Sequence, residues 1–129
     1  MLAVEDDPGS LQLLAYLVKH AGYECVEAST PADAIGVLER DPRVGLVLTD
    51  IRMPGSKDGL HLIHELAERW PSLPVAAITG YPDDLKVLSD APSTPVVTVF
   101  PKPIREQDML RLIRLIKALG RTNADAVAM

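Results

Sequence analysis

The sequence has little of what would cross-link the chain or anchor it in a membrane. Its single cysteine, Cys25, excludes an intrachain disulfide and a zinc site built from cysteines. No apolar run approaches the roughly 20 residues that a membrane-spanning helix needs. No basic segment precedes an apolar one near the start, so we expect no export signal. These absences favour a cytoplasmic protein that does not engage a membrane.

Positive charge is also scarce. Thirteen basic side chains stand against 18 acidic ones and leave a formal net charge of −5. Such a chain has no general electrostatic attraction to nucleic acid or to anionic lipid, so direct nucleic-acid binding is not expected. The 129 residues, 47% of them hydrophobic, suit one globular domain, since domains commonly have roughly 100–150 residues. Composition therefore excludes several functions and indicates none.

Short apolar runs alternate along the chain with amphipathic stretches. The predicted strands are Met1–Val4, Glu24–Ala28, Val44–Thr49, Pro74–Thr79 and Val96–Phe100. The predicted helices are Leu11–Ala21, Pro31–Arg40, Asp58–Trp70, a short one at Asp83–Leu88, and Arg105–Leu119. Five β/α units with short connections predict an α/β fold, in which a parallel sheet is covered by helices on both faces.

Chemically notable residues follow four of these strands. The acidic run Glu5–Asp7 follows the first strand and Asp50 the third, while Thr79 ends the fourth and Lys102 comes just after the fifth. The carboxyl ends of parallel strands share one edge of the sheet, where ligands of such folds bind. If these four strands are neighbours, we expect the side chains to converge on one pocket.

Such a pocket would bring carboxylates of like charge together. Each close pair costs about 1–4 kcal/mol at effective dielectric constants between 80 and 20. A hard divalent cation would relieve this repulsion, and Mg²⁺ fits best because it prefers oxygen ligands and commonly binds carboxylates together with phosphate oxygens. Asp50 could then act as a nucleophile toward a phosphoryl group. Lys102 and the Thr79 hydroxyl could bind that group.

The motifs in this order resemble the receiver (response-regulator) domains of two-component signalling. The matching segments are Glu5-Asp6-Asp7, Leu-Thr-Asp50-Ile-Arg-Met53-Pro54-Gly55, Asp58-Gly59-Leu60, Ile-Thr79-Gly80 and Lys102-Pro103. The resemblance covers about residues 1–119 and leaves residues 120–129 as a C-terminal tail. It implies a flavodoxin-like five-stranded sheet in the order 2-1-3-4-5.

The resemblance also implies roles for single residues. Asp50 matches the phospho-acceptor. Asp6 matches the direct magnesium ligand, Glu5 an acid that acts mainly through water, and the backbone carbonyl of Arg52 a third protein ligand. The positions of Thr79 and Lys102 match the hydroxyl and the lysine that contact the phosphoryl group.

Other matching positions concern the rate and the switch. Arg52 and Tyr81 fall where family members vary the lifetime of the phosphoryl group, and Gly80 matches a small residue that keeps the site open. The family's switch aromatic is replaced by Val99. Phe100 comes one residue later and should point to the opposite face of the sheet. The usual aromatic switch therefore does not carry over.

The implied protein is a phospho-accepting regulator rather than an enzyme with a separate substrate. Its implied partners are a sensor histidine kinase or phosphotransfer protein, and a downstream protein that the sequence does not identify. A homodimer is a further hypothesis. We expect either a stand-alone receiver or one excised from a longer chain.

Three alternatives stay open at the level of sequence. A phosphorylation-independent scaffold with the receiver fold is the main rival, because Val99 departs from the switch pattern. A flavin or nucleotide carrier would need a phosphate-binding loop where the run Glu5–Asp7 stands. A small aspartate phosphohydrolase usually has an Asp-x-Asp pair at that position and a substrate cap, for which this chain has no room.

Overall fold

The computed structural model describes residues 1–51, 59–80 and 96–118. Within these ranges the elements follow one another as strand and helix in alternation. They are β1 (Leu2–Val4), α1 (Pro8–His20), β2 (Val26–Ala28), α2 (Pro31–Arg40), β3 (Val47–Asp50), α3 (Gly59–Arg69), β4 (Val75–Thr79), β5 (Val96–Pro101) and α5 (Glu106–Ala118). The helix predicted at Asp83–Leu88 lies outside the described residues.

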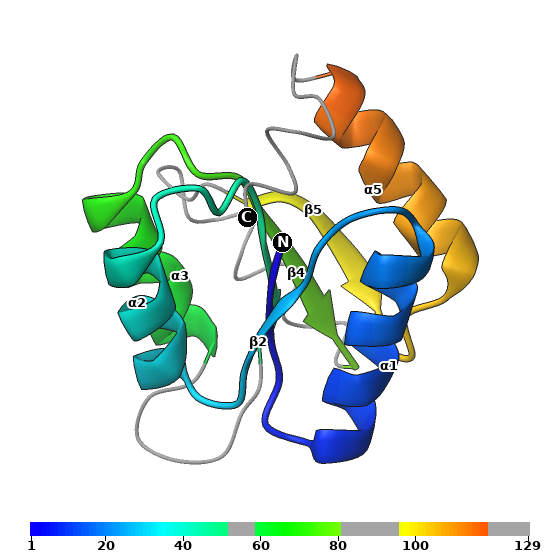
Figure 1. The fold of residues 1–129 in the computed structure, drawn as a ribbon, viewed down its shortest axis with the longest axis horizontal. Coiled ribbons are helices and arrows are strands. Elements are labelled where there is room, and N and C mark those ends of the chain that lie inside the picture. Colours follow the sequence, from blue (N-terminus) through cyan, green and yellow to red (C-terminus); the bar gives the residue numbers. More distant parts are fainter. Residues whose placement is uncertain (52–58, 81–95, 119–129) are drawn as a thin grey trace.

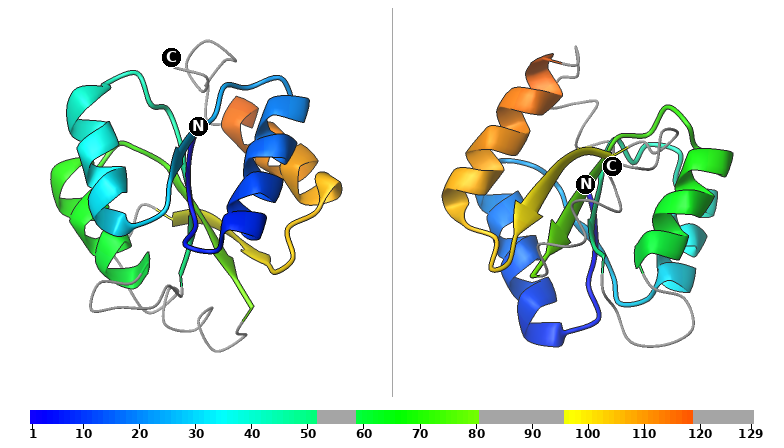
Figure 2. Two further views of the ribbon diagram at one scale, coloured as in Figure 1. Left: turned by 60° about the horizontal axis from the view of Figure 1, so that its bottom comes forward. Right: turned by 180° about the vertical axis from the view of Figure 1, so that it is seen from behind.

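The five strands form one parallel sheet in the order β2-β1-β3-β4-β5, so the predicted fold and strand order are confirmed. Helices α2 and α3 cover one face of the sheet, and α1 and α5 cover the other (Figure 1). The two further views show the same three layers from other directions (Figure 2). In the described parts of the chain, no helix combines the length and the apolar character needed to cross a membrane.

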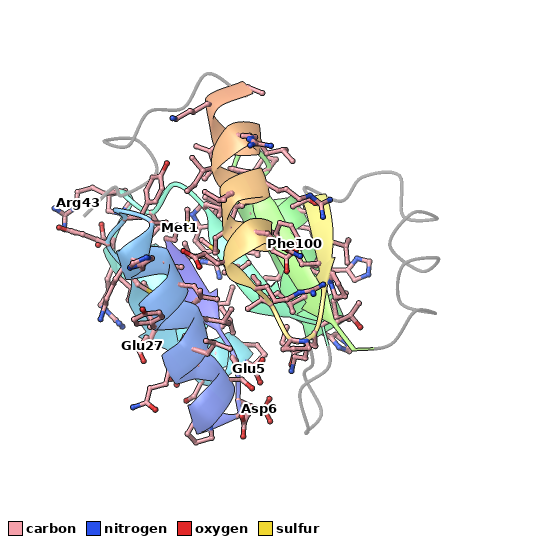
Figure 3. All side chains as sticks on the ribbon, turned by 90° about the vertical axis from the view of Figure 1, so that its right-hand side faces the viewer. Met1, Glu5, Asp6, Glu27, Arg43 and Phe100 are labelled. Carbon is pink, nitrogen blue, oxygen red and sulfur yellow. The ribbon has the colours of Figure 1, made fainter. Side chains whose placement is uncertain are left out.

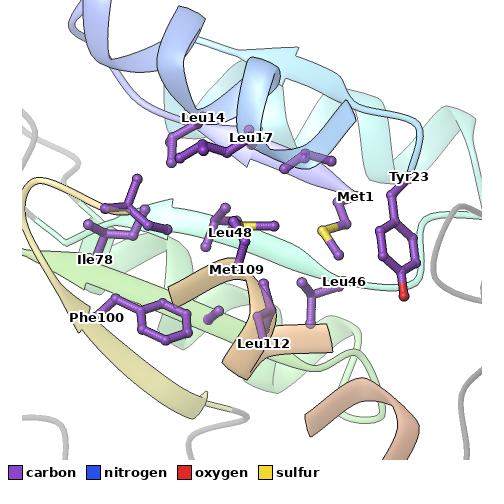
Figure 4. Packing of buried hydrophobic residues seen from close by; sticks show 14 of the residues in the cluster. Met1, Leu14, Leu17, Tyr23, Leu46, Leu48, Ile78, Phe100, Met109 and Leu112 are labelled. Carbon is purple, nitrogen blue, oxygen red and sulfur yellow. The ribbon is translucent and has the colours of Figure 1, made fainter. Parts of the chain in front are cut away.

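Alternation along the strands fills two cores, one on each face. Along β1, Ala3 packs in the core under α1 and α5, whereas Leu2 and Val4 pack in the core under α2 and α3. The α1/α5 core is also built from Leu48, Ile78, Phe100, Met109 and Leu112 (Figure 4). Because both faces are covered, the central strands β1, β3 and β4 are buried along their whole length, as is typical of parallel sheets.

Two helices begin with the same local signal, a capping side chain followed by proline. Thr30 caps α2, where its Oγ1 accepts the backbone N–H of Asp33 at 3.1 Å, and Pro31 opens the helix. Asp7 caps α1 in the same way, and Pro8 is the first helical residue. Helix α1 therefore starts three residues before the predicted Leu11, and the Asp7-Pro8 pair was the signal for it.

Replacing Thr30 with alanine (Thr30→Ala) should lower the free energy of unfolding by about 1 kcal/mol, because α2 loses its N-cap. Urea denaturation measures this change. The matched control is Ser29→Ala, which removes a neighbouring hydroxyl whose contact with Asp33 is longer, at 3.4 Å. The control should change stability by less than about 0.5 kcal/mol. Equal losses in the two variants would contradict the cap.

Candidate functional site

The topology brings the predicted site residues to one edge of the sheet. Glu5 follows β1, Asp50 ends β3, Thr79 ends β4 and Lys102 follows β5. The strands carrying them are neighbours in the order β1-β3-β4-β5, and all of them run in the same direction. Glu5 and Asp6 lie at this edge, next to the start of α1 (Figure 3). The structure therefore juxtaposes residues that are up to about a hundred positions apart in sequence.

Lys102 is the cation at the centre of this cluster. Its Nζ donates a hydrogen bond to Asp50 Oδ2 at 2.6 Å and lies 3.2 Å from Glu5 Oε2. Asp50 and Glu5 are each 1% exposed, whereas the Lys102 side chain is 34% exposed. The ammonium group thus joins two buried carboxylates and remains in contact with solvent.

Two opposing effects of its surroundings act on the pKa of Lys102. Partial burial lowers the pKa of Lys102, but the hydrogen bonds and charges of Asp50 and Glu5 outweigh this effect and leave the pKa above its ordinary value. The lysine is therefore fully charged at neutral pH. Its backbone is also fixed, because the Lys102 N–H donates to the carbonyl oxygen of Thr79 at 2.9 Å.

Glu5 is the most strongly perturbed acid of the cluster. Burial, followed by the neighbouring Asp50 carboxylate, raises the pKa of Glu5 to about 7, against the opposing effects of the Asp7 N–H and Lys102. Its Oε1 accepts the backbone N–H of Asp7 at 3.1 Å. Its Oε2 is buried and, within the described residues, forms an ion pair with Lys102 without good hydrogen-bond geometry.

The donor set fits a hard divalent cation. Glu5, Asp6 and Asp50 each offer a carboxylate oxygen, and these atoms lie within 4.8 Å of one another. Three carboxylates and the single ammonium group of Lys102 leave two negative charges uncompensated when all are ionised. The buried Glu5 Oε2 accepts no hydrogen bond within the described residues, so its lone pairs can coordinate a cation. Oxygen ligands of this kind are those that Mg²⁺ prefers.

The remaining predicted positions divide into two groups. Thr79 is 5% exposed at the end of β4, and a Cβ added at Gly80 would lie 3.8 Å from Lys102 Cβ, which is an ordinary contact. An alanine would therefore fit at Gly80 beside the lysine. The predicted positions Arg52 and Tyr81 lie outside the described residues.

Val99 and Phe100 face opposite sides of the sheet, as expected. Val99 packs at the edge of the α2/α3 core, and Phe100 is fully buried in the α1/α5 core (Figure 4). The guanidinium of Arg111 on α5 lies 5.6 Å from the centre of the Phe100 ring. Phe100 is therefore a core residue and cannot replace the missing aromatic at Val99 without a rearrangement of β5.

Comparison with families of known proteins identifies the family of this chain. Residues 1–114 match the model of the response regulator receiver domain. The chain belongs to this family. Receiver domains act in two-component signalling, so the chain is a component of phosphorelay signalling.

Individual relatives agree with the family. The transcriptional regulatory protein GlrR of Escherichia coli is 38% identical over 81 residues, which are 63% of this chain and 18% of GlrR. The response regulator protein TmoT of Ectopseudomonas mendocina is 32% identical over 114 residues, which are 86% of this chain and 49% of TmoT. The chain thus spans about half or less of the length of these curated relatives.

A solved structure shows the same architecture. The response regulator receiver protein from Pseudomonas putida superposes with a TM-score of 0.78 at 26% identity, over 88% of this chain and 93% of that one. The receiver fold deduced from the strand order is therefore shared along nearly the whole chain.

The structure adds two features to the predicted site. Asp7 belongs to the predicted acidic run, but its Oδ2 accepts both the N–H and the hydroxyl of Ser10, at 2.9 and 2.8 Å, so it caps α1. The second feature is a cavity of about 310 Å³ beside Glu5 and Lys102, between α1 and the segment after β5. The cavity left no signal in the sequence, because its walls come from three distant segments.

Magnesium should stabilise this receiver domain through the carboxylate cluster. At about 100 times its Kd, Mg²⁺ should add about 2.7 kcal/mol to the free energy of unfolding, since it binds only the folded state. Asp6→Asn should lose most of this gain. The charge-matched control is Glu68→Gln on the exposed face of α3, which should keep it. Urea denaturation with MgCl₂ or EDTA measures the effect, and an undiminished gain in Asp6→Asn would contradict the site.

Proposed function

We propose that this receiver domain accepts a phosphoryl group on the carboxylate of Asp50 and that the modification switches a protein-binding surface. One observation carries the proposal: Asp50 Oδ2 lies 2.6 Å from the Lys102 ammonium, at the edge of the sheet where ligands of such folds bind. A carboxylate that is held by a cation at this edge can attack an incoming phosphorus atom. The added phosphoryl charge then remains next to Lys102.

In the proposed transfer, an Asp50 oxygen attacks the phosphorus of a phosphohistidine on the donor protein. A bond between oxygen and phosphorus forms, and the bond between phosphorus and nitrogen breaks, with its electron pair going to the departing imidazole. Lys102 compensates the charge of the transferred group, and the Thr79 hydroxyl donates a hydrogen bond to one of its oxygens. Burial holds the Asp50 carboxylate in one orientation for this attack.

The proposed metal ligands are the carboxylates of Glu5, Asp6 and Asp50, together with the backbone carbonyl of Arg52. Bound Mg²⁺ would neutralise these carboxylates and the phosphoryl oxygens, which otherwise repel one another. Asp6, the least buried of the three acids, provides the direct ligand, and Glu5 acts mainly through water. Gly80, Tyr81, Arg52 and Val99 are the proposed positions that set the lifetime of the phosphoryl group and the response to it.

The proposal defines the partners by their chemistry. A sensor histidine kinase or a phosphotransfer protein donates the phosphoryl group in the cytoplasm, and a downstream protein recognises the phosphorylated form. The domain, residues 1–119 with a tail at 120–129, is a regulator that catalyses only its own phosphorylation and dephosphorylation. The buried Asp50 carboxylate, paired with the partly exposed Lys102, favours this function over a phosphorylation-independent scaffold, which has no use for buried carboxylates.

Asp50→Asn should abolish phosphorylation by a small phosphodonor such as acetyl phosphate, because an amide oxygen is a poor nucleophile. Intact-protein mass spectrometry with and without MgCl₂ measures the modified fraction. The matched control, Asp33→Asn, changes an exposed aspartate in the first turn of α2 and should be modified like the unaltered protein. Modification that persists in Asp50→Asn would overturn the proposal.

Lys102→Ala should lower the rate of phosphorylation by about 100-fold, as expected for the loss of one preorganised group that stabilises developing charge. Timed intact-protein mass spectrometry gives the rate. Lys117→Ala removes an exposed lysine from the last turn of α5 and serves as the control. An unchanged rate in Lys102→Ala would exclude the proposed role of the ammonium group.

A further inference from the structure

The cavity next to the carboxylate cluster has two kinds of wall. Glu5 and Lys102 form its polar side, which it shares with the proposed acceptor site. The rest of the lining is mostly apolar and comes from Leu13 and Leu14 on α1, Ile78 on β4, and Pro103 and Ile104 after β5. A molecule in this cavity would therefore touch the site and an apolar wall at the same time.

The apolar wall is well formed rather than a random hollow of the surface. Leu14, Ile78 and Ile104 are at most 5% exposed and belong to the α1/α5 core, and Leu14 and Ile78 lie at the same end of that core (Figure 4). Leu13 differs from them, because 41% of its surface is exposed at the rim. A concave, mostly apolar wall with a few polar groups at one side has the make-up of a small-molecule pocket.

The size and the polarity of the cavity limit its occupant. Its volume is about 310 Å³, whereas an apolar cavity of about 150 Å³ suffices to bind benzene. Among the described residues of the wall, the one other polar side chain is Ser10, whose hydroxyl donates to Asp7 Oδ2 at 2.8 Å and is therefore already engaged. The cavity thus suits a ring-sized apolar group with a charged end toward Lys102.

We propose that this cavity binds the leaving group of a small-molecule phosphodonor, and that it favours acyl phosphates with an aromatic acyl group over those with a small one. The inference rests on the proposed acceptor function of Asp50. The cavity is continuous with the proposed acceptor site, because Lys102 contacts Asp50 and also lines the cavity. A group attached to phosphorus at the site therefore reaches the apolar wall directly.

The proposed step balances without a further reactant. An Asp50 oxygen attacks the phosphorus of the acyl phosphate, and a new oxygen–phosphorus bond forms. The bond between phosphorus and the acyl oxygen breaks, and its electron pair leaves with that oxygen as a free carboxylate. No proton is transferred. Lys102 faces the leaving carboxylate with its charge, and Leu13 and Ile104 contact the ring.

The test compares benzoyl phosphate with acetyl phosphate as donors to the complete chain. Mass spectrometry of the phosphorylated protein, in MgCl₂, gives the second-order rate constant of phosphorylation by each donor. The decisive variant is Leu13→Ala, which shortens a partly exposed side chain and should leave folding intact. The matched control is Leu110→Ala on α5, which truncates an equally apolar residue that is 54% exposed and does not line the cavity.

Leu13→Ala should lower the ratio of the benzoyl to the acetyl rate by about tenfold, the lower end of the effect of a lost methylene contact in an apolar pocket. Its rate with acetyl phosphate should stay unchanged. Leu110→Ala should keep the original ratio, and Leu13→Met should restore most of it. Comparison between variants cancels the different intrinsic reactivities of the two donors.

The outcomes separate the inference from the function on which it rests. Asp50 could be phosphorylated with the same ratio of benzoyl to acetyl rates in Leu13→Ala, Leu110→Ala and the unaltered protein. This result would overturn the cavity as a leaving-group site, but the proposed acceptor function would stand. An equal loss with both donors in Leu13→Ala would also overturn it, because that pattern reports damage to the site. Failure of both donors to modify Asp50 in any variant would overturn the proposed function and this inference together.

Discussion

The structure depends on the burial of two carboxylates side by side, with one ammonium group to hold them. Glu5 and Asp50 are nearly inaccessible, and Lys102 contacts both, at 3.2 and 2.6 Å. Buried charges are costly unless they are paired, and removal of one partner leaves the other uncompensated. The pairing is incomplete here, because Asp6 adds a third acid. This residual negative charge makes the edge of the sheet receptive to a cation, which in the proposed function would in turn make it receptive to a phosphoryl group.

The rest of the fold serves to keep this cluster in place. Parallel pairing sets the ends of β1, β3, β4 and β5 at one edge, and two apolar cores fix the sheet from both sides. The Lys102 backbone is tied to the end of β4 by its hydrogen bond to Thr79. Rigid strands and covered faces thus define where the ammonium group lies. The same packing of α1 against the segment after β5 leaves the cavity that adjoins Glu5 and Lys102, so the carboxylate cluster and the cavity are products of one arrangement.

The departure at Val99 changes how a signal can leave the site. Phe100 is locked into the α1/α5 core beneath Arg111, and Val99 faces the other core. An aromatic side chain that rotates between a buried and an exposed position is therefore absent at this point of β5. If Asp50 is phosphorylated as proposed, the response therefore does not pass through the rotation of a ring at position 99 of β5.

The sequence by itself determined the alternation of strands and helices and the residues that end the strands. Those features follow from local periodicity and from capping residues such as Thr30, which act over short segments, whereas the strand order was implied by the resemblance to receiver domains. It also indicated Glu5, Asp50 and Lys102 as companions. Only the tertiary structure decided that Glu5 turns inward, that its burial raises its pKa to about 7, and that a cavity adjoins the site. The reason is physical: burial, pairing of charges and empty space arise from segments distant in sequence, and no local pattern records how closely those segments pack.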